Sequence, residues 1–251
     1  MQLPKRLLPY MKNEAYRTDE IGMSGSQVLI LSGKVLKIER KCAESDNEHA
    51  MYAWLRGKLS VPRVFESFSE DGYNYLLMER VAGEMACGEG MMRDPQHAVS
   101  MLAKGLRALW SVDIKGCPAD QRLSQKLPRA KARLEAGLID EGDTEPDTLT
   151  RFASMQALYR YLDEHRPPED LVFSHGDYCL PNVFFDRGVV SGFIDLGRSG
   201  VADRWQDIAL CVRSLAHNFG TDRYRELLLA ELNLPCDAER IDYYILLDEF
   251  F

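Results

Sequence analysis

Two short polar motifs near residue 180 limit the possible folds of this chain more than any other part of its sequence. In the first, His175–Asn182, an aspartate and an asparagine lie five positions apart, at Asp177 and Asn182. A phosphotransfer loop uses this spacing to present a carboxylate to an acceptor hydroxyl and an amide oxygen to a metal ion. In the second, Asp195 follows thirteen positions later, after an apolar stretch, where a carboxylate suits Mg²⁺. The first motif alone fits a polar turn, but the pair at hairpin distance favours phosphotransfer chemistry, with His175 as a brace of the loop.

The first third of the chain supplies parts that suit a nucleotide. Lys37 lies on the apolar run Val35–Ile38, and Glu48 falls on the helix expected after it. A strand lysine can contact the α- and β-phosphates of a nucleotide while a helix glutamate orients it. Each of the two residues alone is typical of a solvated surface charge. Ahead of them, the backbone N–H groups of Gly22–Ser26 suit a phosphate-covering loop, although the segment matches neither a G-x-G-x-x-G nor a Walker motif.

The order of expected elements places strands first and helices afterwards. The first third contains one expected helix, at Ser45–Gly57. It also contains four β-rich runs, at Ser26–Leu31, Val35–Glu39, Val64–Phe68 and Tyr75–Glu79. The remainder is mainly helical around a compact β segment at Leu171–Ile194, and its helices are expected at Asp94–Trp110, Ser124–Ala136, Thr148–Glu164, Arg204–Ala216, Asp222–Glu231 and Asp237–Leu247. We therefore expect an α+β, protein-kinase-like fold of two lobes. The small β-rich nucleotide-binding lobe spans 1–79, the hinge 80–83, and the larger, mainly helical catalytic lobe 84–251.

Charge and composition narrow the partners and the compartment. The 251 residues include 31 Lys and Arg against 39 Asp and Glu, a net charge of −8. Proteins that bind nucleic acid usually need a basic face, so neutral or cationic partners are favoured instead. No apolar run approaches the ~18 residues of a spanning helix, and the first residues do not read as a signal peptide. We expect a cytoplasmic protein without a membrane or nucleic-acid partner. Six cysteines without a C-x-x-C pair argue against a disulfide framework or a structural zinc site.

Two acidic clusters have alternative interpretations. Glu135–Thr150 carries six acids and no base, which is usually a solvated loop. Beside a phosphotransfer site, however, clustered acids raise the local concentration of a cationic substrate. The substrate-facing residues expected in this cluster are Asp140, Asp143, Glu145 and Asp147. Asp248 and Glu249 form a second cluster close to Phe251, which without further information is typical of a frayed, inert end.

These motifs resemble those of the aminoglycoside phosphotransferases, specifically the 3′-phosphotransferases. The resemblance covers nearly the whole chain and is densest over Val172–Ser214, including Phe173–Asp177, Ser191–Arg198 and Ala202–Ala209, and it closes with Tyr243–Phe251. It implies transfer of the γ-phosphoryl group of ATP to a hydroxyl of an aminoglycoside such as kanamycin or neomycin. Mg²⁺ is the implied cofactor, and antibiotic resistance the implied result.

The resemblance also implies roles for individual residues. Asp177 is the implied catalytic residue, with Asn182 and Asp195 as Mg²⁺ ligands. The implied nucleotide-binding positions are Met23, Ser24, Lys37 and Glu48. We add Met78, because a preference for ATP or GTP depends on the hinge backbone near Met78–Val81. The implied positions along the aminoglycoside pocket are Arg198, Arg213, Asp248, Glu249 and the carboxylate of Phe251.

Two departures from the family pattern leave the drug spectrum open. Val35 stands where some members stack an aromatic residue on adenine, and His217 and Asn218 stand where a relative carries acids. Two other functions stay open as well. One is a kinase of another small hydroxylated amine or metabolite, similar to choline or homoserine kinases, and the other is a nucleotide-binding pseudoenzyme. The acidic clusters favour a polycationic substrate. The presence of Asp177, Asn182 and Asp195 argues against a pseudoenzyme.

Overall fold

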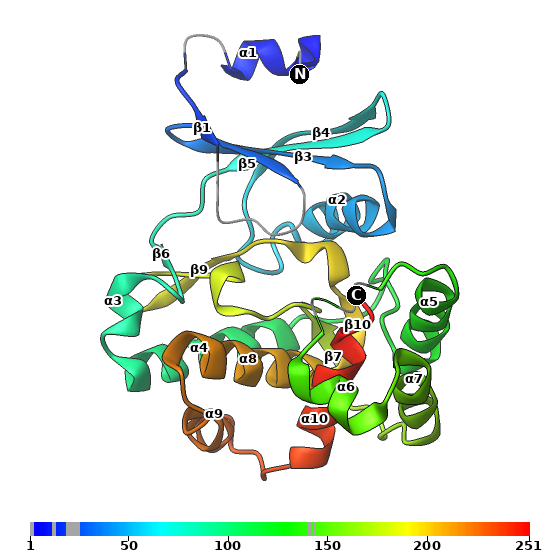
Figure 1. The fold of residues 1–251 in the computed structure, drawn as a ribbon. Helices are drawn as coiled ribbons and strands as arrows, with labels where there is room; N and C mark the ends of the chain where they lie inside the picture. Colours follow the sequence, from blue (N-terminus) through cyan, green and yellow to red (C-terminus); the bar gives the residue numbers. More distant parts are fainter. Residues whose placement is uncertain (1–2, 12–13, 19–25, 140–141, 143) are drawn as a thin grey trace.

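The computed structural model describes residues 3–11, 14–18, 26–139, 142 and 144–251, without the side chains of Pro146 and Asp147. A lobe built on a sheet, formed by the first part of the chain, sits on a larger lobe of helices (Figure 1). Strand β5 (Tyr73–Glu79) ends the small lobe, and the next strand, β6 (Glu84–Met85), already pairs with a strand of the large lobe. The expected α+β, kinase-like architecture is confirmed. The division into 1–79, 80–83 and 84–251 stays a proposal.

Five antiparallel strands form the sheet of the small lobe in the order β1-β2-β3-β5-β4 (Figure 1). The other elements of this lobe are η1 (Lys5–Leu7), α1 (Leu8–Met11), β1 (Arg17–Thr18), β2 (Gln27–Ile30), β3 (Lys34–Arg40), α2 (Ala43–Leu55) and β4 (Val64–Glu70). Side chains along a strand alternate between the two faces of its sheet. Leu36 and Ile38 therefore pack in an apolar cluster on one face. Lys37, between them, points to the other face, toward α2 and the large lobe.

The large lobe consists mainly of helices with two small antiparallel sheets, β6-β8-β9 and β10-β7. Its helices are α3 (Glu89–Met92), α4 (Pro95–Trp110), α5 (Leu123–Glu135), α6 (Pro146–Phe152), α7 (Met155–Glu164), α8 (Arg204–Phe219), α9 (Tyr224–Leu232) and α10 (Ala238–Asp248). Its strands and short 3-10 turns are β7 (Leu171–Ser174), η2 (Leu180–Asn182), β8 (Val183–Asp186), β9 (Val189–Phe193), η3 (Leu196–Arg198) and β10 (Gly200–Asp203). The β8–β9 hairpin places residues on either side of it, Asn182 and Asp195, at the same end of the sheet.

Local capping chemistry changes two expected helices. The helix expected over Thr148–Glu164 is wrong as a single element, because Ala153 adopts a left-handed conformation (φ 58°) and ends α6. The Ser154 side chain then accepts the N–H of Ala157 and starts α7, as serine does at helix N-termini. Helix α2 begins at Ala43, two residues earlier than expected, because Cys42 and Ser45 form a capping box.

A continuous apolar core runs from α2 and β5 through α4, α8 and α10. Tyr178, immediately after Asp177, has no exposed surface and donates its hydroxyl to the carbonyl of Leu102 on α4 at 2.8 Å. Its ring lies 6.3 Å from the ring of Phe193, at the end of β9. The expected catalytic loop is therefore anchored in the core by the residue next to Asp177.

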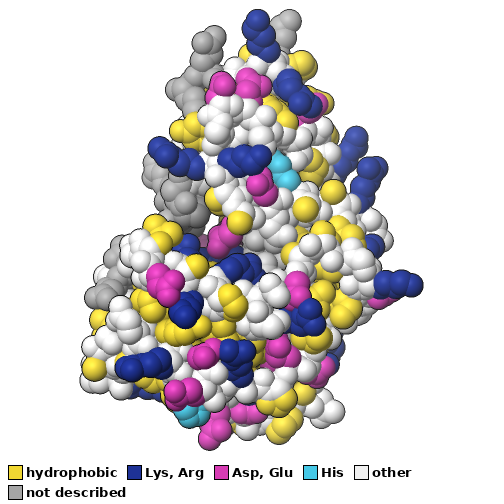
Figure 2. Space-filling view, turned by 90° about the vertical axis from the view of Figure 1, so that its right-hand side faces the viewer, with side chains coloured by type: hydrophobic (Ala, Val, Ile, Leu, Met, Phe, Trp, Pro, Cys, Tyr) yellow, Lys and Arg dark blue, Asp and Glu magenta, His cyan; other side chains and the backbone are white. Residues whose placement is uncertain are grey.

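Among the described residues, no helix is both long and apolar enough to cross a membrane. On the face shown in Figure 2, acidic and basic side chains alternate over both lobes, and neither sign forms a continuous patch.

Gly105→Ala should destabilise the protein, although alanine is the better helix former. In a helix interior this exchange normally stabilises by about 0.5–1 kcal/mol. Here the new Cβ would lie 2.1 Å from the Tyr178 hydroxyl oxygen, and overpacking a buried site costs about 1–3 kcal/mol. We expect a lower urea midpoint of unfolding.

Tyr178→Phe is the compensating substitution, because it removes the hydroxyl oxygen that the new methyl group would meet. The double variant should be more stable than Gly105→Ala alone. A Gly105→Ala protein at least as stable as the wild type would contradict the packing described for α4.

Candidate active site

A buried carboxylate on α8 holds the loop that follows β7. Asp207 has no exposed surface and accepts hydrogen bonds from three consecutive residues. The donors are the hydroxyl of Ser174 (3.0 Å) and the N–H groups of His175 (2.8 Å) and Gly176 (2.9 Å). Burial raises the pKa of Asp207, and the His175 ring and these donors oppose the rise. One side chain therefore fixes the direction in which the chain leaves β7.

The next two residues turn the loop toward the β8–β9 hairpin. Gly176 has φ 83°, and a Cβ there would lie 2.0 Å from the carbonyl oxygen of Arg198, so glycine is needed. The Nε2 of His175 lies 3.0 Å from the carbonyl oxygen of Ile194, and its Nδ1 lies 3.3 Å from the N–H of Asp177. A carbonyl can only accept, so Nε2 carries the proton and Nδ1 is the acceptor. His175 braces the loop by hydrogen bonds, as expected from the sequence.

Both carboxylate oxygens of Asp177 are held by neighbouring side chains. The Nδ2 of Asn182 donates to Oδ2 at 3.0 Å and also to the Asp177 carbonyl at 3.0 Å. The thiol of Cys179 lies 3.0 Å from Oδ1. The amide of Asn182 is thereby oriented with its nitrogen toward Asp177, and within the described part of the chain no donor bonds its oxygen, which can face a cation.

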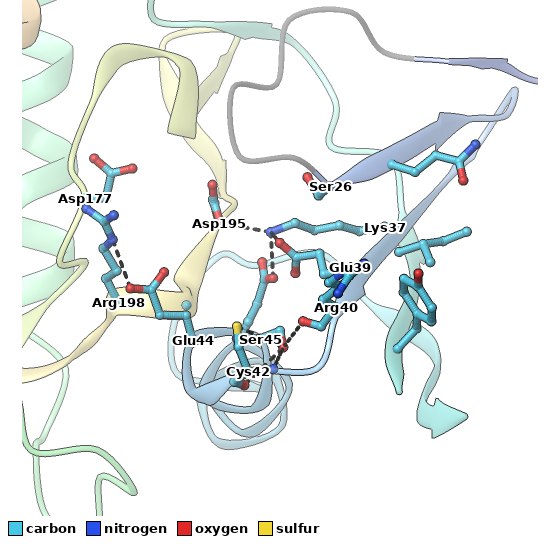
Figure 3. A pocket seen from close by; sticks show the side chains of 15 residues that line it. Ser26, Lys37, Glu39, Arg40, Cys42, Glu44, Ser45, Asp177, Asp195 and Arg198 are labelled. Carbon is cyan, nitrogen blue, oxygen red and sulfur yellow. Dashed lines mark hydrogen bonds and ion pairs between the residues drawn. The ribbon is translucent and has the colours of Figure 1, made fainter. Parts of the chain in front are cut away.

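Lys37 connects the two lobes through a network of carboxylates (Figure 3). Its Nζ lies 2.8 Å from Glu48 on α2, 3.0 Å from Asp195 of the large lobe, and 3.1 Å from Glu39 on its own strand. Burial by itself would lower the pKa of Lys37, but the three carboxylates raise it well above its usual value. Burial also raises the pKa of Glu48, whereas Lys37 lowers it. The lysine is therefore a fixed cation, placed by strand alternation where the lobes meet.

The residues expected to hold Mg²⁺ fit that role in part. Asp195 has φ 60°, and its side chain is 42% exposed even though one oxygen bonds Lys37. Burial would raise the pKa of Asp195, but Lys37 holds it below its usual value, so the carboxylate is charged. The N–H of Ile194 donates to the carbonyl of Asn182 at 3.0 Å, which keeps the segments that carry the two residues side by side. Among the described residues, no group of three His, Cys, Asp or Glu side chains is arranged to hold a metal ion, so nucleotide phosphates and water would complete the shell, as is usual for Mg²⁺.

Two cavities meet at Asp177 and Arg198. The first, about 660 Å³, is lined by Lys37, Glu48 and Asp195 together with these two residues, and Figure 3 shows it from close by. The second, about 730 Å³, opens on the large lobe, and Asp177 and Arg198 line it as well. A carboxylate on the shared wall can reach a group bound in either cavity.

The second cavity gathers the residues expected to face an aminoglycoside. Those of the expected set that line it are Glu145, Arg198, Arg213, Asp248, Glu249 and Phe251. Asp248 is paired with both Arg198 and Arg213, and the guanidinium of Arg198 also donates to the Phe251 carbonyl oxygen at 2.7 Å. Glu249 accepts from the hydroxyl of Thr148 at 3.2 Å and the N–H of Glu145 at 3.3 Å. Glu145 of the acidic segment and the acidic cluster at 248–249 therefore lie on one cavity.

Six other expected positions are not assigned to these cavities. Met23, Ser24, Asp140 and Asp143 lie outside the described residues, as does the side chain of Asp147. Met78 is buried in β5 opposite Val35 and is not among the residues that line either cavity. Their roles stay predictions.

Sequence reasoning assigned no role to Asp207 or Cys179, although both shape the loop. Asp207 could have been found as a charged residue directly before the apolar stretch Ile208–Val212 of helix α8, since a buried charge is costly unless it is hydrogen-bonded. Cys179 carried no such signal, because cysteine is common in apolar interiors without any role.

In this arrangement a loop carboxylate lies between a lysine-bearing cavity and an acidic one, and fold and site together define a kinase-like phosphotransferase. The phosphotransferase enzyme family, compared as a sequence model, matches residues 16–241. An aminoglycoside 3′-phosphotransferase from Enterococcus faecalis is 38% identical over 98% of both chains. One from Niallia circulans is 44% identical over 79% of this chain and 76% of the relative. The crystal structure of an aminoglycoside-3′-phosphotransferase of type VIII has a TM-score of 0.83 at 29% identity, covering 98% of this chain and 97% of the other. The chain belongs to the phosphotransferase enzyme family, and within it to the aminoglycoside 3′-phosphotransferases, as the resemblance implied.

Asp207→Asn should loosen the loop, because an amide nitrogen would face N–H donors that now meet a carboxylate oxygen. Leaving buried donors unsatisfied and removing the charge should cost about 2–4 kcal/mol of unfolding free energy. Turnover should fall at least ~10-fold. Chemical denaturation and steady-state kinetics measure the two effects.

Asp242→Asn is the control, since Asp242 forms a largely exposed ion pair with Arg151 on the surface. Exposed pairs contribute about 0–1 kcal/mol, so its stability and turnover should hardly change. If Asp207→Asn behaves like this control, the loop does not depend on Asp207.

Proposed function

We propose that this protein transfers the γ-phosphoryl group of ATP to the 3′-hydroxyl of an aminoglycoside of the kanamycin or neomycin class and so confers resistance. The observation that carries the proposal is the position of Asp177 on the wall shared by both cavities. The relatives with the same activity in their names support the acceptor class. We propose the cytoplasm as its compartment, and we keep GTP as the alternative nucleotide.

On the nucleotide side, Lys37 contacts the phosphates and Glu48 keeps its ammonium group in place. Met23 and Ser24 are proposed to cover the phosphates, and the backbone at Met78, beside the hinge, to contact the base. Mg²⁺, held by Asn182 and Asp195, would neutralise charge on the phosphates as the γ-group leaves. The free amide oxygen of Asn182 and the charged, partly exposed carboxylate of Asp195 support this assignment.

On the acceptor side, Asp177 orients the 3′-hydroxyl and accepts its proton as the bond from oxygen to the γ-phosphorus forms. The bond from the γ-phosphorus to the β–γ bridging oxygen breaks in the same step, and the products are ADP and the phosphorylated drug. Glu145 and Glu249 are proposed to bind ammonium groups of the drug, together with Asp140, Asp143 and Asp147. Asp248 shares its charge with two arginines, so it is better suited to placing Arg198 and Arg213 than to carrying a full negative charge for the substrate.

The first test is regiospecific turnover by the purified protein with ATP and Mg²⁺. An aminoglycoside with a 3′-hydroxyl should be phosphorylated, and an analogue without that hydroxyl should not, as detected by ADP release and by the position of phosphate in the product. Asp177→Asn keeps the shape of the side chain but loses the proton acceptor, so turnover should fall ~10²-fold or more with nucleotide affinity little changed.

Two outcomes would contradict the proposal. One is equal turnover of the analogue that lacks the 3′-hydroxyl, which would place the reaction on another hydroxyl. The other is near-normal turnover by folded Asp177→Asn, which would remove Asp177 from the reaction.

A second test concerns the acids of the second cavity. In the proposed function this is the acceptor cavity, and the first is the nucleotide cavity. Glu145→Gln combined with Glu249→Gln keeps the acceptor oxygens but removes two charges. We expect the aminoglycoside KM to rise about three- to tenfold at low salt and less at high salt, because salt screens exposed charges. The KM for ATP should not move.

Glu164→Gln is the matched control, because Glu164 lies at the exposed end of α7 and outside the cavity. An aminoglycoside KM that stays the same in the double variant at low salt would leave these acids without a role in binding.

A further inference from the structure

Cys179 is attached to Asp177 at two points. Its N–H donates to the carbonyl of Asp177 at 2.9 Å, and its thiol lies 3.0 Å from Oδ1 of the same residue. The following backbone is fixed too, since the N–H of Leu180 donates to the Ser214 hydroxyl at 3.0 Å. The backbone of Cys179 is therefore fixed at a place from which its sulfur reaches the carboxylate.

The thiol is the donor in this contact. The sulfur lies 3.0 Å from a carboxylate oxygen, and a carboxylate can only accept, so the thiol donates its hydrogen to Oδ1. Asn182 holds the other oxygen at 3.0 Å, so each carboxylate oxygen has one donor from the protein.

Cys179 also lies on the side where the acceptor binds. It lines the acceptor cavity with Asp177, whereas it is not among the residues that line the nucleotide cavity. Within the described part of the chain, it is the one side chain that donates to Oδ1. With one hydrogen bond on each oxygen, the carboxylate plane is set, and the remaining lone pairs are presented to the cavity.

We propose that Cys179 is a positioning residue for the reaction, whose thiol holds the Asp177 carboxylate in the orientation that receives the acceptor hydroxyl. This inference rests on the proposed function of the same site. A thiol is a weak donor, and for that reason it can orient the carboxylate while withdrawing little of the electron density that accepts the proton. Positioning of reacting groups within a fraction of an ångström has large effects on rate.

The test compares Cys179→Ala, which removes the donor, with Cys179→Ser, which keeps a donor in the same place. We expect the alanine variant to lose about tenfold in kcat, with the KM values for ATP and for kanamycin changed less than about twofold. The serine variant should recover most of the loss. Cys236→Ala, at an exposed cysteine outside both cavities, should match the wild type.

A double-mutant cycle decides whether the thiol acts through Asp177. In the Asp177→Asn background, Cys179→Ala should cause little further loss in single-turnover phosphorylation, because residues that act as one unit are not additive. An unchanged kcat in Cys179→Ala, an equal loss in the alanine and serine variants, or the same tenfold factor in both backgrounds would each overturn the proposal.

A structural readout separates this inference from the proposed function. A crystal structure of Cys179→Ala should show the Asp177 carboxylate rotated or in two orientations, and a single unchanged orientation would refute the inference without any turnover measurement. Absence of wild-type phosphorylation with every aminoglycoside would instead count against the proposed function alone.

Discussion

The buried carboxylate of Asp207 is the interaction on which the rest of the site depends. It lies in the core, on a helix that cannot move without disturbing the packing of the large lobe, and it binds the loop through three backbone and side-chain donors. Because a buried charge is stable only when its partners are in place, the loop and the helix fix one another. His175 and Gly176 then hold Asp177 in a defined position, although Asp177 lies in a segment without regular secondary structure. The position of the Asp177 carboxylate is thus determined by contacts in the core rather than by contacts at the surface of the cavities.

Charge balance explains how the nucleotide side is arranged. Lys37 is one cation among Glu39, Glu48 and Asp195, so the local sum is already negative before a triphosphate enters. Phosphates would bring further negative charge into a partly enclosed space, where interactions between charges are stronger than in water. A divalent cation, which Asn182 and Asp195 would hold, would offset that repulsion. The network that fixes the lysine would therefore make metal and nucleotide binding interdependent.

The order of strands and helices followed from periodicity and turn residues, and the motif spacing placed Asp177, Asn182 and Asp195 on one site. The lysine–glutamate pair was expected from its positions on a strand and the next helix, and the distance of 2.8 Å bears this out. The break at Ala153 was missed because its left-handed conformation has no glycine to mark it. Asp207 and Cys179 received no role, because their contacts join segments about thirty residues apart or depend on the turn of a single loop. Periodicity reports which face is buried, but it does not report which buried polar groups meet.

Arg198 reaches across the boundary between the lobes. One of its nitrogens lies 3.5 Å from Glu44 on α2, while others bond Asp248 and the Phe251 carbonyl on the acceptor side. Because one guanidinium makes all of these contacts, a shift that changes its contact with Asp248 also changes its contact with Glu44. In the proposed function, a substitution at Asp248 that alters the acceptor side would also alter the contact of Arg198 with Glu44. The two lobes share this one guanidinium, so a change on either side of it is transmitted to the other.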